Sequence, residues 1–416
     1  MTVGARQEWR KYWTLPLAGA LGNSLTVLLV YSLGIFMEPL TAEFGWNRAE
    51  ISAGITVANF TALGLGLLSG MLVDRFGPRR VGIIGVALMC MATALLGTAT
   101  GTLTNWYMLW GLVALGGAGV GPFIWTSAVA SRFDASRGLA IAIVVSGAGL
   151  AATILPPLTA WLLQHYGWRG GFFGIGAIWA VVVIPVLLLF FRGAYDGRDR
   201  PTKAQVKTRT DAMPGLSLAE GLRSAPFWRL GLAGGFFAFV AIGLIVHFVP
   251  ILKDSGLDLA TSARVAGTIG LASLVGRFGT GFLLDRLDPR LVAAVAFALP
   301  TVAVALLLSG GSPLVLTIAA FVVGLSLGAE LDVTFYLATR YFGLKSYGVL
   351  MSAMMGMLAI GMALGPVSAG AIFDRTESYA NFLWLSIPLV LIASLMVGTL
   401  KRHPDWGDAK GDAGGH

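Results

Sequence analysis

The chain has 416 residues, of which 56% are hydrophobic and 12% are charged, and its formal net charge is +8. A soluble domain carries roughly 25% charged residues, so this composition excludes an ordinary soluble protein. Long apolar stretches recur throughout and the alternation typical of a transmembrane β-barrel is absent, so we expect an all-α membrane protein in a lipid bilayer. No nucleic-acid partner is expected, because the basic residues fall in short loops between apolar stretches.

The cysteine content and the first apolar run exclude further classes. Cys90 is the single cysteine, so a disulfide framework is impossible. No cleavable signal peptide is expected, because the apolar run after Arg10-Lys11 is longer than the hydrophobic region of a signal. No cofactor is expected. We also predict no metal site, because no second histidine or cysteine lies near His247 in the sequence.

The apolar stretches define twelve predicted transmembrane helices, each long enough to cross a bilayer. In chain order they are Tyr12–Glu38, Glu50–Val73, Arg80–Thr98, Asn105–Ser131, Gly138–Gln164, Gly170–Phe191, Phe227–Leu252, Leu259–Leu284, Leu291–Ser309, Pro313–Tyr341, Ser346–Phe373 and Tyr379–Leu400.

The distribution of Lys and Arg predicts the orientation of the chain in the membrane. With a cytoplasmic N-terminus, nearly all 29 basic residues fall on the cytoplasmic side. The exceptions are the internal Arg277 and the outer Arg48, Arg169, Lys253, Arg264 and Arg375. We therefore expect a multi-pass protein of a bacterial-type cytoplasmic (inner) membrane, with both termini cytoplasmic.

The longest polar segment divides the predicted helices six and six. We predict a first six-helix bundle in residues 1–191, a cytoplasmic linker in residues 192–225 and a second six-helix bundle in residues 226–416. Within the linker, Ser217-Leu-Ala-Glu220 has the spacing of a capping box, which predicts a short surface helix before Phe227. We interpret the basic residues of the linker as orientation determinants that also attract anionic lipid.

The two halves of the sequence are copies of each other. The segment Gly70-Met-Leu-Val-Asp74-Arg75-Phe-Gly-Pro78-Arg79 aligns with Gly281-Phe-Leu-Leu-Asp285-Arg286-Leu-Asp-Pro289-Arg290 at a shift of 211 residues. Parallel repeats of six helices predict a pseudo-two-fold axis along the membrane normal, with a substrate site near the midplane between the halves. Because one chain then holds the whole pathway, we expect a monomer.

These features resemble the major facilitator superfamily, which has twelve helices, a six-plus-six repeat and the motif G-x-x-x-D-R-x-G-x-R/K after helices two and eight. The first copy of the motif is complete, and the second has Asp288 where the family often has Gly. The resemblance implies the major facilitator fold, transport by alternating access rather than enzymatic activity, and a gate at the motif charges. Those charges are Asp74, Arg75, Arg79, Asp285 and Arg286. The alternative is that they only set orientation.

Within that superfamily the chain is similar to the monocarboxylate porter and oxalate/formate antiporter group. The similarity lies in Tyr31–Phe36 with Glu43–Glu50, in Arg132–Ala140 with Ser146–Gly149, and in Gly276-Arg277 of the eighth helix. The match implies that Arg277 binds substrate. The chain departs from the group at Ser273, where animal members carry a carboxylate. It also lacks the signature before the first helix and the eleventh-helix lysine of oxalate carriers.

Arg277 is the central candidate, because a permanent cation inside a transmembrane helix is costly unless it is paired. The repeat has Gly66 at this position, so the charge belongs to the second half alone. Two interpretations are open. Arg277 forms a structural ion pair within the second half, or its guanidinium binds a carboxylate substrate through two parallel hydrogen bonds. We favour substrate binding.

Glu330 and Asp332 are the acidic residues at similar depth, in the tenth helix. Their spacing turns them about 200° apart, so they do not both face the pathway. We predict that one pairs with Arg277 and that a desolvated carboxylate carries a proton; a fixed partner for Arg277 is the alternative. His247, near the outer end of the seventh helix, is either a proton relay or a hydrogen-bonded wall residue.

Further candidates come from polar and amphipathic residues at membrane depth, which either face the pathway or pack between helices. In the first half they are Tyr31 and Asn59, which we prefer, together with Asn23, Trp125 and Thr126. In the second half they are Tyr336 and Ser273.

The charges also indicate a transport mode. Arg277 with two carboxylates is net −1, so an added anion requires a proton. We therefore predict a secondary transporter of a small organic monoanion (a monocarboxylate), coupled to protons and working by alternating access. The same charge admits a cationic or amphipathic compound exported by proton antiport. A membrane sensor with a transporter fold and no flux is the third alternative.

Overall fold

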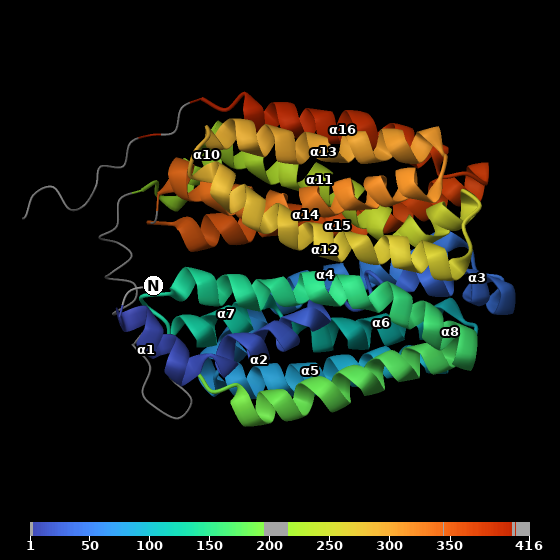
Figure 1. Cartoon of the computed structure of the whole chain (residues 1–416), viewed down its shortest axis with the longest axis horizontal. Helices are drawn as coiled ribbons and strands as arrows, with labels where there is room; N and C mark the ends of the chain where they lie inside the picture. The colour runs from blue at the N-terminus through green and yellow to red at the C-terminus, as the bar shows by residue number, and fades with distance from the viewer. Residues whose placement is uncertain (1–2, 195–214, 344, 402–403, 405–416) are drawn as a thin grey trace, which may run out of the picture.

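A computed structural model describes residues 3–194, 215–343, 345–401 and 404 of this chain, and nearly all of them are helical. The long helices run side by side, with α1 (Val3–Tyr12) and α10 (Leu218–Arg223) at the same end of the molecule (Figure 1). We call that end the N-terminal face. The opposite end, where α4 begins at Arg48, is called the Arg48 face.

The helices of the two sequence halves group into two bundles (Figure 1). After α1, the first half contains α2 (Thr14–Asn23), η1 (Ser24–Val27), α3 (Leu33–Phe44), α4 (Arg48–Phe76), α5 (Pro78–Leu95), η2 (Leu96–Thr98), α6 (Leu103–Ala118), α7 (Pro122–Ala130) and α8 (Arg137–Phe190). After α10, the second half contains α11 (Ala225–Asp254), α12 (Leu259–Leu284), α13 (Pro289–Ser309), α14 (Pro313–Phe342), α15 (Tyr347–Thr376) and α16 (Ala380–Gly398).

The twelve predicted helices map onto these elements, with two broken spans and one merged pair. The first span is α2, η1 and α3, and the fourth is α6 and α7, separated by residues 119–121. The fifth and sixth are merged in α8, where Gly167 has φ +67°. In the described part of the chain, nine helices satisfy length and hydropathy criteria for a span, or ten with the bent α4. The second passage of α8 and the broken first span complete the twelve.

Hydroxyl side chains explain the break in the first span. Ser24 donates to the carbonyl oxygen of Leu21 at 2.6 Å, and Thr26 donates to that of Asn23 at 2.7 Å. Ser32 donates to the carbonyl oxygen of Leu28 at 2.8 Å. Such bonds compete with the helical backbone pattern and bend helices. Hydropathy alone misses this effect, because the surrounding residues stay apolar.

The linker helix and its capping box are confirmed. The Ser217 hydroxyl accepts the backbone N–H of Glu220 at 3.4 Å, and the Glu220 carboxylate accepts the backbone N–H of Ser217 at 2.8 Å. This capping box begins α10. The remainder of the predicted linker lies mostly in residues 195–214, outside the described residues.

Hydrogen bonds connect α1 to the first bundle at the N-terminal face. The Glu8 carboxylate accepts the backbone N–H groups of residues 134–136, which lead into α8. The backbone N–H groups of Ala135 and Asp134 stabilise the ionised form and lower the pKa of Glu8 to about 2. This short helix precedes the first predicted span and holds the loop between α7 and α8 in place.

Glycines bring helices of the second bundle into backbone contact. A Cβ atom at Gly361 of α15 would overlap the carbonyl oxygen of Gly235 on α11, and one at Gly365 would overlap that of Phe239. Small residues of this kind allow close packing in a membrane, where lipid removes most of the hydrophobic drive between helices. The α11–α15 interface therefore depends on the absence of these two side chains.

We expect Gly365→Val to force α11 and α15 apart and to lower stability by about 1–3 kcal/mol, the usual cost of overpacking. Thermal unfolding of the detergent-purified protein measures the effect. Gly356→Val is the matched control in the same helix, because a Cβ atom there meets nothing within 4 Å. Equal melting temperatures for the two variants would contradict the proposed backbone contact.

Candidate functional site

Arg277 and Asp332 form an ion pair inside the second bundle. Arg277 on α12 donates from Nη1 to Oδ1 of Asp332 on α14 at 2.6 Å. The two side chains are 19% and 27% exposed, so the pair is accessible. A Cβ atom at Gly328 would overlap the carbonyl oxygen of Ser273, which shows how closely α14 packs on α12 beside the pair. Of the two acidic residues expected at this depth, Asp332 is therefore the partner of Arg277.

Glu330 lies on the side of α14 that faces α11, away from Arg277. Its side chain is 5% exposed, and a Cβ atom at Gly234 of α11 would stand 3.7 Å from its Oε1 atom. Among the described residues, this Oε1 has no hydrogen-bond partner, and the Thr334 hydroxyl lies one turn later on the same helix. The two carboxylates thus occupy different surroundings, as a two-residue separation on a helix requires. Asp332 belongs to an accessible ion pair, and Glu330 is a buried carboxylate between helices.

The first bundle has no charge at the position related to Arg277 by the repeat. A Cβ atom at Gly66 would meet no other atom within 4 Å, so the space beside this residue is open. α4 also bends by 53° between Gly66 and Leu68. At this position the halves therefore differ in charge, and the helix of the first half also bends.

Tyr336 and Ser273 are the nearest predicted neighbours of the ion pair in sequence. Tyr336 lies one turn after Asp332 on α14, and its hydroxyl accepts a hydrogen bond from Arg340 at 3.0 Å. Ser273 lies one turn before Arg277, and its hydroxyl donates to the carbonyl oxygen of Gly270 at 2.7 Å. Both side chains are partly buried. Tyr336 extends the polar side of α14 towards the N-terminal face.

Tyr31 and Asn59 are the preferred candidates of the first half, and both are partly buried. Tyr31 lies in the turn before α3 and contacts hydrophobic clusters of both bundles. Asn59 on α4 donates to the carbonyl oxygen of Ile55 at 3.0 Å. It also lines a cavity of about 190 Å³ together with Thr26. These positions place Tyr31 between the bundles and Asn59 within the first.

Trp125 differs from the expectation that it lines the pathway. Its side chain is 0% exposed, and its indole N–H donates to the carbonyl oxygen of Val120 at 2.8 Å. The ring fills the space above Gly22 and Gly82, where any Cβ atom would collide with it. Trp125 is therefore a core residue of the first bundle in this structure. Its large apolar ring is satisfied by packing, so its depth in the membrane did not indicate a binding role.

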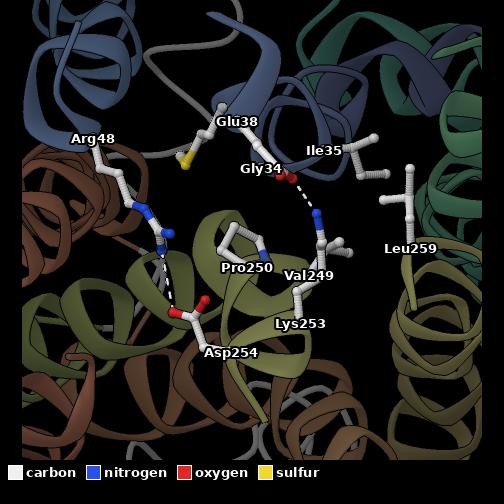
Figure 2. A pocket seen from close by; sticks show the side chains of 10 residues that line it. Gly34, Ile35, Glu38, Arg48, Val249, Pro250, Lys253, Asp254 and Leu259 are labelled. Atoms are coloured by element: carbon white, nitrogen blue, oxygen red, sulfur yellow. Dashed lines mark hydrogen bonds and ion pairs between the residues drawn. The ribbon is translucent and has the colours of Figure 1, made fainter. Parts of the chain in front are cut away.

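The halves are joined at the Arg48 face by Arg48 itself. Its Nη1 atom donates to the Tyr379 hydroxyl at 2.7 Å and lies 3.4 Å from Oδ2 of Asp254. Figure 2 shows this ion pair and a second one between Lys253 and Glu38, both lining a cavity of about 230 Å³ between the bundles. Two ion pairs between the halves therefore meet at one small polar cavity.

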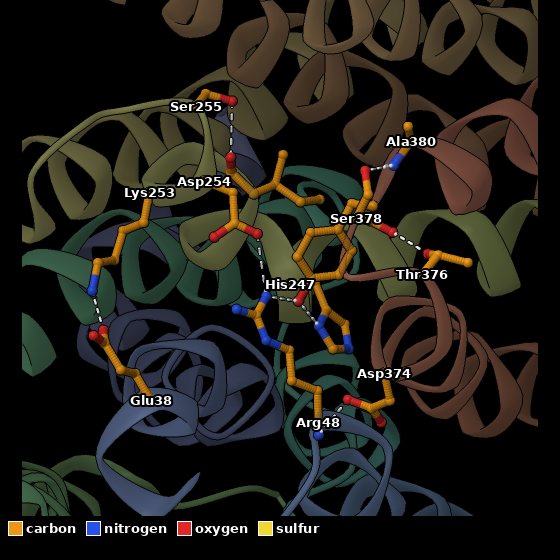
Figure 3. Close-up of polar contacts among 12 residues, drawn as sticks. Glu38, Arg48, His247, Lys253, Asp254, Ser255, Asp374, Thr376, Ser378 and Ala380 are labelled. Atoms are coloured by element: carbon orange, nitrogen blue, oxygen red, sulfur yellow. Dashed lines mark hydrogen bonds and ion pairs between the residues drawn. The ribbon is translucent and has the colours of Figure 1, made fainter. Parts of the chain in front are cut away.

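Asp374 adds a contact to the backbone. Its carboxylate, near the end of α15, accepts the backbone N–H of Arg48 at 3.0 Å (Figure 3) and that of Ala49 at 2.8 Å. These groups open α4 and have no partner within that helix, so a carboxylate there is stabilising. Gly370, one turn earlier, permits the approach, because a Cβ atom would stand 2.6 Å from the Ala49 nitrogen. The end of one bundle thus binds the helix start of the other.

His247 of α11 is close to Arg48 through Tyr379 and is 0% exposed. Its Nε2 is 2.9 Å from the carbonyl oxygen of Pro366, which only accepts, so we assign the proton to Nε2. Nδ1 then accepts the Tyr379 hydroxyl at 2.7 Å, while Ser52 of α4 lies 3.2 Å from Nε2. The histidine is thus linked to Arg48 through Tyr379. We call Arg48, Ser52, His247, Asp254, Asp374 and Tyr379 the Arg48 latch.

The Arg48 latch was not predicted from the sequence, in which Arg48 and Lys253 are only exceptions to the charge bias. The partners of Arg48 lie 206 and 331 residues away in the chain, so no local pattern pairs them. One feature of the sequence could have indicated these contacts. The few basic residues expected on the outer side share that side with Asp254 and Asp374, which also lie at ends of predicted spans.

The predicted gate charges make other contacts. Arg79 donates to the carbonyl oxygen of Leu188 at 2.7 Å, and Arg286 lies 4.0 Å from the ring centre of Phe282. Arg75 lies 5.3 Å from the ring centre of Phe76, and Asp285 directly follows the last residue of α12. These contacts stay within single bundles. The gate at the N-terminal face therefore remains a prediction.

Comparison with known proteins identifies the family. The family model described as Major Facilitator Superfamily matches residues 19–366, so the chain belongs to that superfamily. Monocarboxylate transporter 13 of Bos taurus is 27% identical and aligns over 94% of this chain and 89% of its own length. Monocarboxylate transporter 11 of Homo sapiens is 26% identical over 94% and 83%. An uncharacterized MFS-type transporter of Escherichia coli (strain K12) is 27% identical over 82% and 84%.

Solved structures agree on the fold. A D-xylose-proton symporter has a TM-score of 0.75 at 13% identity and covers 95% of this chain and 98% of its own. A bacterial homolog of the human lysosomal transporter Spinster, in an inward-facing conformation, has a TM-score of 0.70 at 18% identity, over 92% and 97%. The protein is thus a multi-pass membrane transporter with the major facilitator fold and not an enzyme.

We expect Asp374→Asn to weaken closure at the Arg48 face, because a neutral amide is a weaker acceptor for the N-terminus of α4. Spin labels at Thr41→Cys and Ala260→Cys, in a Cys90→Ser background, report the distance between the bundles at that face. The distribution should gain a longer component.

Asp258→Asn is the matched control for this measurement, because Asp258 caps α12 within the second bundle. Identical distributions for Asp374→Asn and the unsubstituted labelled protein would contradict a role of Asp374 in holding the halves together.

Proposed function

We propose that this protein transports a small organic monoanion, a monocarboxylate, together with a proton by alternating access. The observation that carries the proposal is the accessible Arg277–Asp332 ion pair. It supplies a guanidinium, the group best suited to bind a carboxylate through two parallel hydrogen bonds. It also supplies a carboxylate that competes with the substrate for that guanidinium.

The competition gives a physical reason for proton coupling. In the structure the charge of Arg277 is already balanced by Asp332. A substrate carboxylate that takes the place of Asp332 leaves an unpaired anion in the membrane interior, which is costly. A proton on Asp332 removes that charge, so the substrate and the proton enter as a neutral pair. One proton per monoanion follows from this charge balance.

Glu330 has a different role in this scheme. It is buried between α11, α14 and α15 without a hydrogen bond to Oε1 among the described residues. It lies away from Arg277, so it does not compete with the substrate directly. We assign the coupling proton to Asp332 and treat Glu330 as a second proton-binding group. His247 belongs to the Arg48 latch, where it connects to Arg48 and not to the ion pair.

Alternating access is supported by the position of the Arg48 latch. With the N-terminal face in the cytoplasm of a bacterial-type inner membrane, the Arg48 latch closes the outer side. Substrate would then exchange with the ion pair from the cytoplasmic side. The motif charges Asp74, Arg75, Arg79, Asp285 and Arg286 would form the opposite gate when the bundles rock. In this scheme residues 1–191 and 226–416 move as two bodies joined by residues 192–225, and one monomer suffices.

The geometry favours an anion over the cationic alternative. A cationic substrate requires a carboxylate that is both accessible and unpaired. Asp332 is accessible but bound to Arg277, and Glu330 is buried. The similarity to monocarboxylate transporters 13 and 11 supports the same choice of substrate class.

We expect Arg277→Gln to abolish monocarboxylate uptake into proteoliposomes and to weaken substrate binding at least tenfold. Hydrogen bonds to charged groups contribute about 1.5–3 kcal/mol each, and the amide retains none of that charge. Arg277→Lys should retain partial activity, because it keeps the charge without the guanidinium fork.

Arg264→Gln is the matched control for uptake, since Arg264 lies on the same helix and donates to Thr261. Unchanged uptake by Arg277→Gln, or equal losses for both Gln variants, would sink the assignment of Arg277 as the substrate-binding group.

We expect Asp332→Asn to uncouple transport from the proton gradient. A one-unit pH gradient corresponds to about 1.4 kcal/mol, which drives roughly tenfold accumulation in one-to-one symport. The variant should lose this accumulation but retain exchange of labelled for unlabelled substrate. Glu330→Gln is the comparison: if it loses accumulation while Asp332→Asn keeps it, the coupling proton belongs to Glu330 instead.

A further inference from the structure

Each bundle contains an apolar groove at the same place in the repeat. The N groove runs between α4 and α5, with α6 as its floor, and has a volume of about 550 Å³. The C groove runs between α12 and α13, with α14 as its floor, and has a volume of about 340 Å³. Six lining residues define the N groove here: Leu68, Leu72, Phe76, Arg80, Ile84 and Leu115. At the shift of 211 residues, five of their counterparts line the C groove, and they are Gly279, Leu283, Leu287, Leu291 and Val295; Leu325 of α14 lies on its floor.

The N groove exposes large apolar side chains to the surroundings of the bundle. Ile84 is 60% exposed, and Leu68 and Leu115 are each 50% exposed. These residues belong to membrane-spanning helices, so the medium that meets them is lipid. An empty apolar groove loses dispersion contacts on its walls, which a hydrocarbon chain restores. The expected occupant is therefore an acyl chain.

The length of the N groove fits one leaflet of a bilayer. Along α5 it extends from Arg80 to Leu88. Eight residues of helix rise about 12 Å. The hydrocarbon layer of one leaflet is about 15 Å deep, half of a core of about 30 Å. A chain that enters at Arg80 would therefore reach close to the bilayer centre.

Arg80 distinguishes the two grooves. It is exposed, it lines the N groove in the first turn of α5, and among the described residues no hydrogen bond or ion pair engages its side chain. Its neighbour Arg79 is committed to the carbonyl oxygen of Leu188. In the C groove the corresponding residue is Leu291, and the preceding Arg290 is held by Asp288 at 2.6 Å.

We propose that the N groove binds one acyl chain of an anionic phospholipid from the leaflet at the N-terminal face, with its phosphate paired with Arg80. The start of α5 strengthens the site, since the N-terminus of a helix attracts phosphate. The C groove accepts acyl chains without selecting the headgroup. This lipid site is separate from the substrate site and does not depend on it.

Native mass spectrometry of the full-length protein, titrated with phosphatidylglycerol or phosphatidylcholine, tests the proposal. We expect the wild type to retain one phosphatidylglycerol preferentially, and Arg80→Leu to bind it about tenfold more weakly with phosphatidylcholine unaffected. Arg10→Leu, on exposed α1 at the same face, is the matched control and should bind as the wild type does.

Two further variants separate the groove from its charge. Leu291→Arg should create a second preferential phosphatidylglycerol site, and Ile84→Trp should fill the N groove and lower the binding of both lipids. The proposal is overturned if Arg80→Leu binds phosphatidylglycerol as the wild type does, or if Leu291→Arg adds no site. A dimer in the spectra that disappears with Ile84→Trp would also overturn it, because a second copy of the chain would then occupy the groove.

Discussion

A permanent cation in the membrane interior must always have a counter-ion, and this requirement governs the second bundle. Arg277 satisfies it with Asp332 at 2.6 Å. An arginine stays charged under all accessible conditions, whereas a carboxylate exchanges protons, so only the acidic partner of the pair is variable. In the proposed mechanism, a change of partner for Arg277 is therefore accompanied by protonation of the carboxylate that it leaves. The close packing of α14 on α12 at Gly328 and Ser273 holds the two groups near each other.

The repeat gives the two bundles one architecture but different tasks. Gly66 and Arg277 occupy equivalent positions, with open space beside the glycine and an ion pair at the arginine. In the first bundle, buried aromatic residues such as Trp106, Trp110 and Trp125 fill the interior. The second bundle contains the buried or paired charges at membrane depth. At this position of the repeat, the charge is therefore found in the second bundle and not in the first.

The sequence was sufficient for the fold because both of its signals are repetitive. Twelve apolar stretches and one duplicated motif place the twelve spans, and Ser217 with Glu220 places the linker helix by a local rule, whereas α1 was not predicted. The Arg48 latch could not be predicted in the same way, because its contacts join distant span ends through single side chains and backbone groups. Trp125 shows a second limit of prediction from sequence, because the depth of an aromatic residue in the membrane does not tell whether its ring is packed in the core or accessible.

The contact between Asp374 and the start of α4 has a consequence for how this surface tolerates sequence change. The carboxylate binds the main-chain N–H groups of Arg48 and Ala49. Every amino acid except proline provides that donor, so substitutions at position 49 leave the contact intact. Its specificity resides in one carboxylate and in the absence of a side chain at Gly370. Sequence change in the loops at the Arg48 face can therefore alter the charges around this contact while the bond between the carboxylate and the start of α4 stays unchanged.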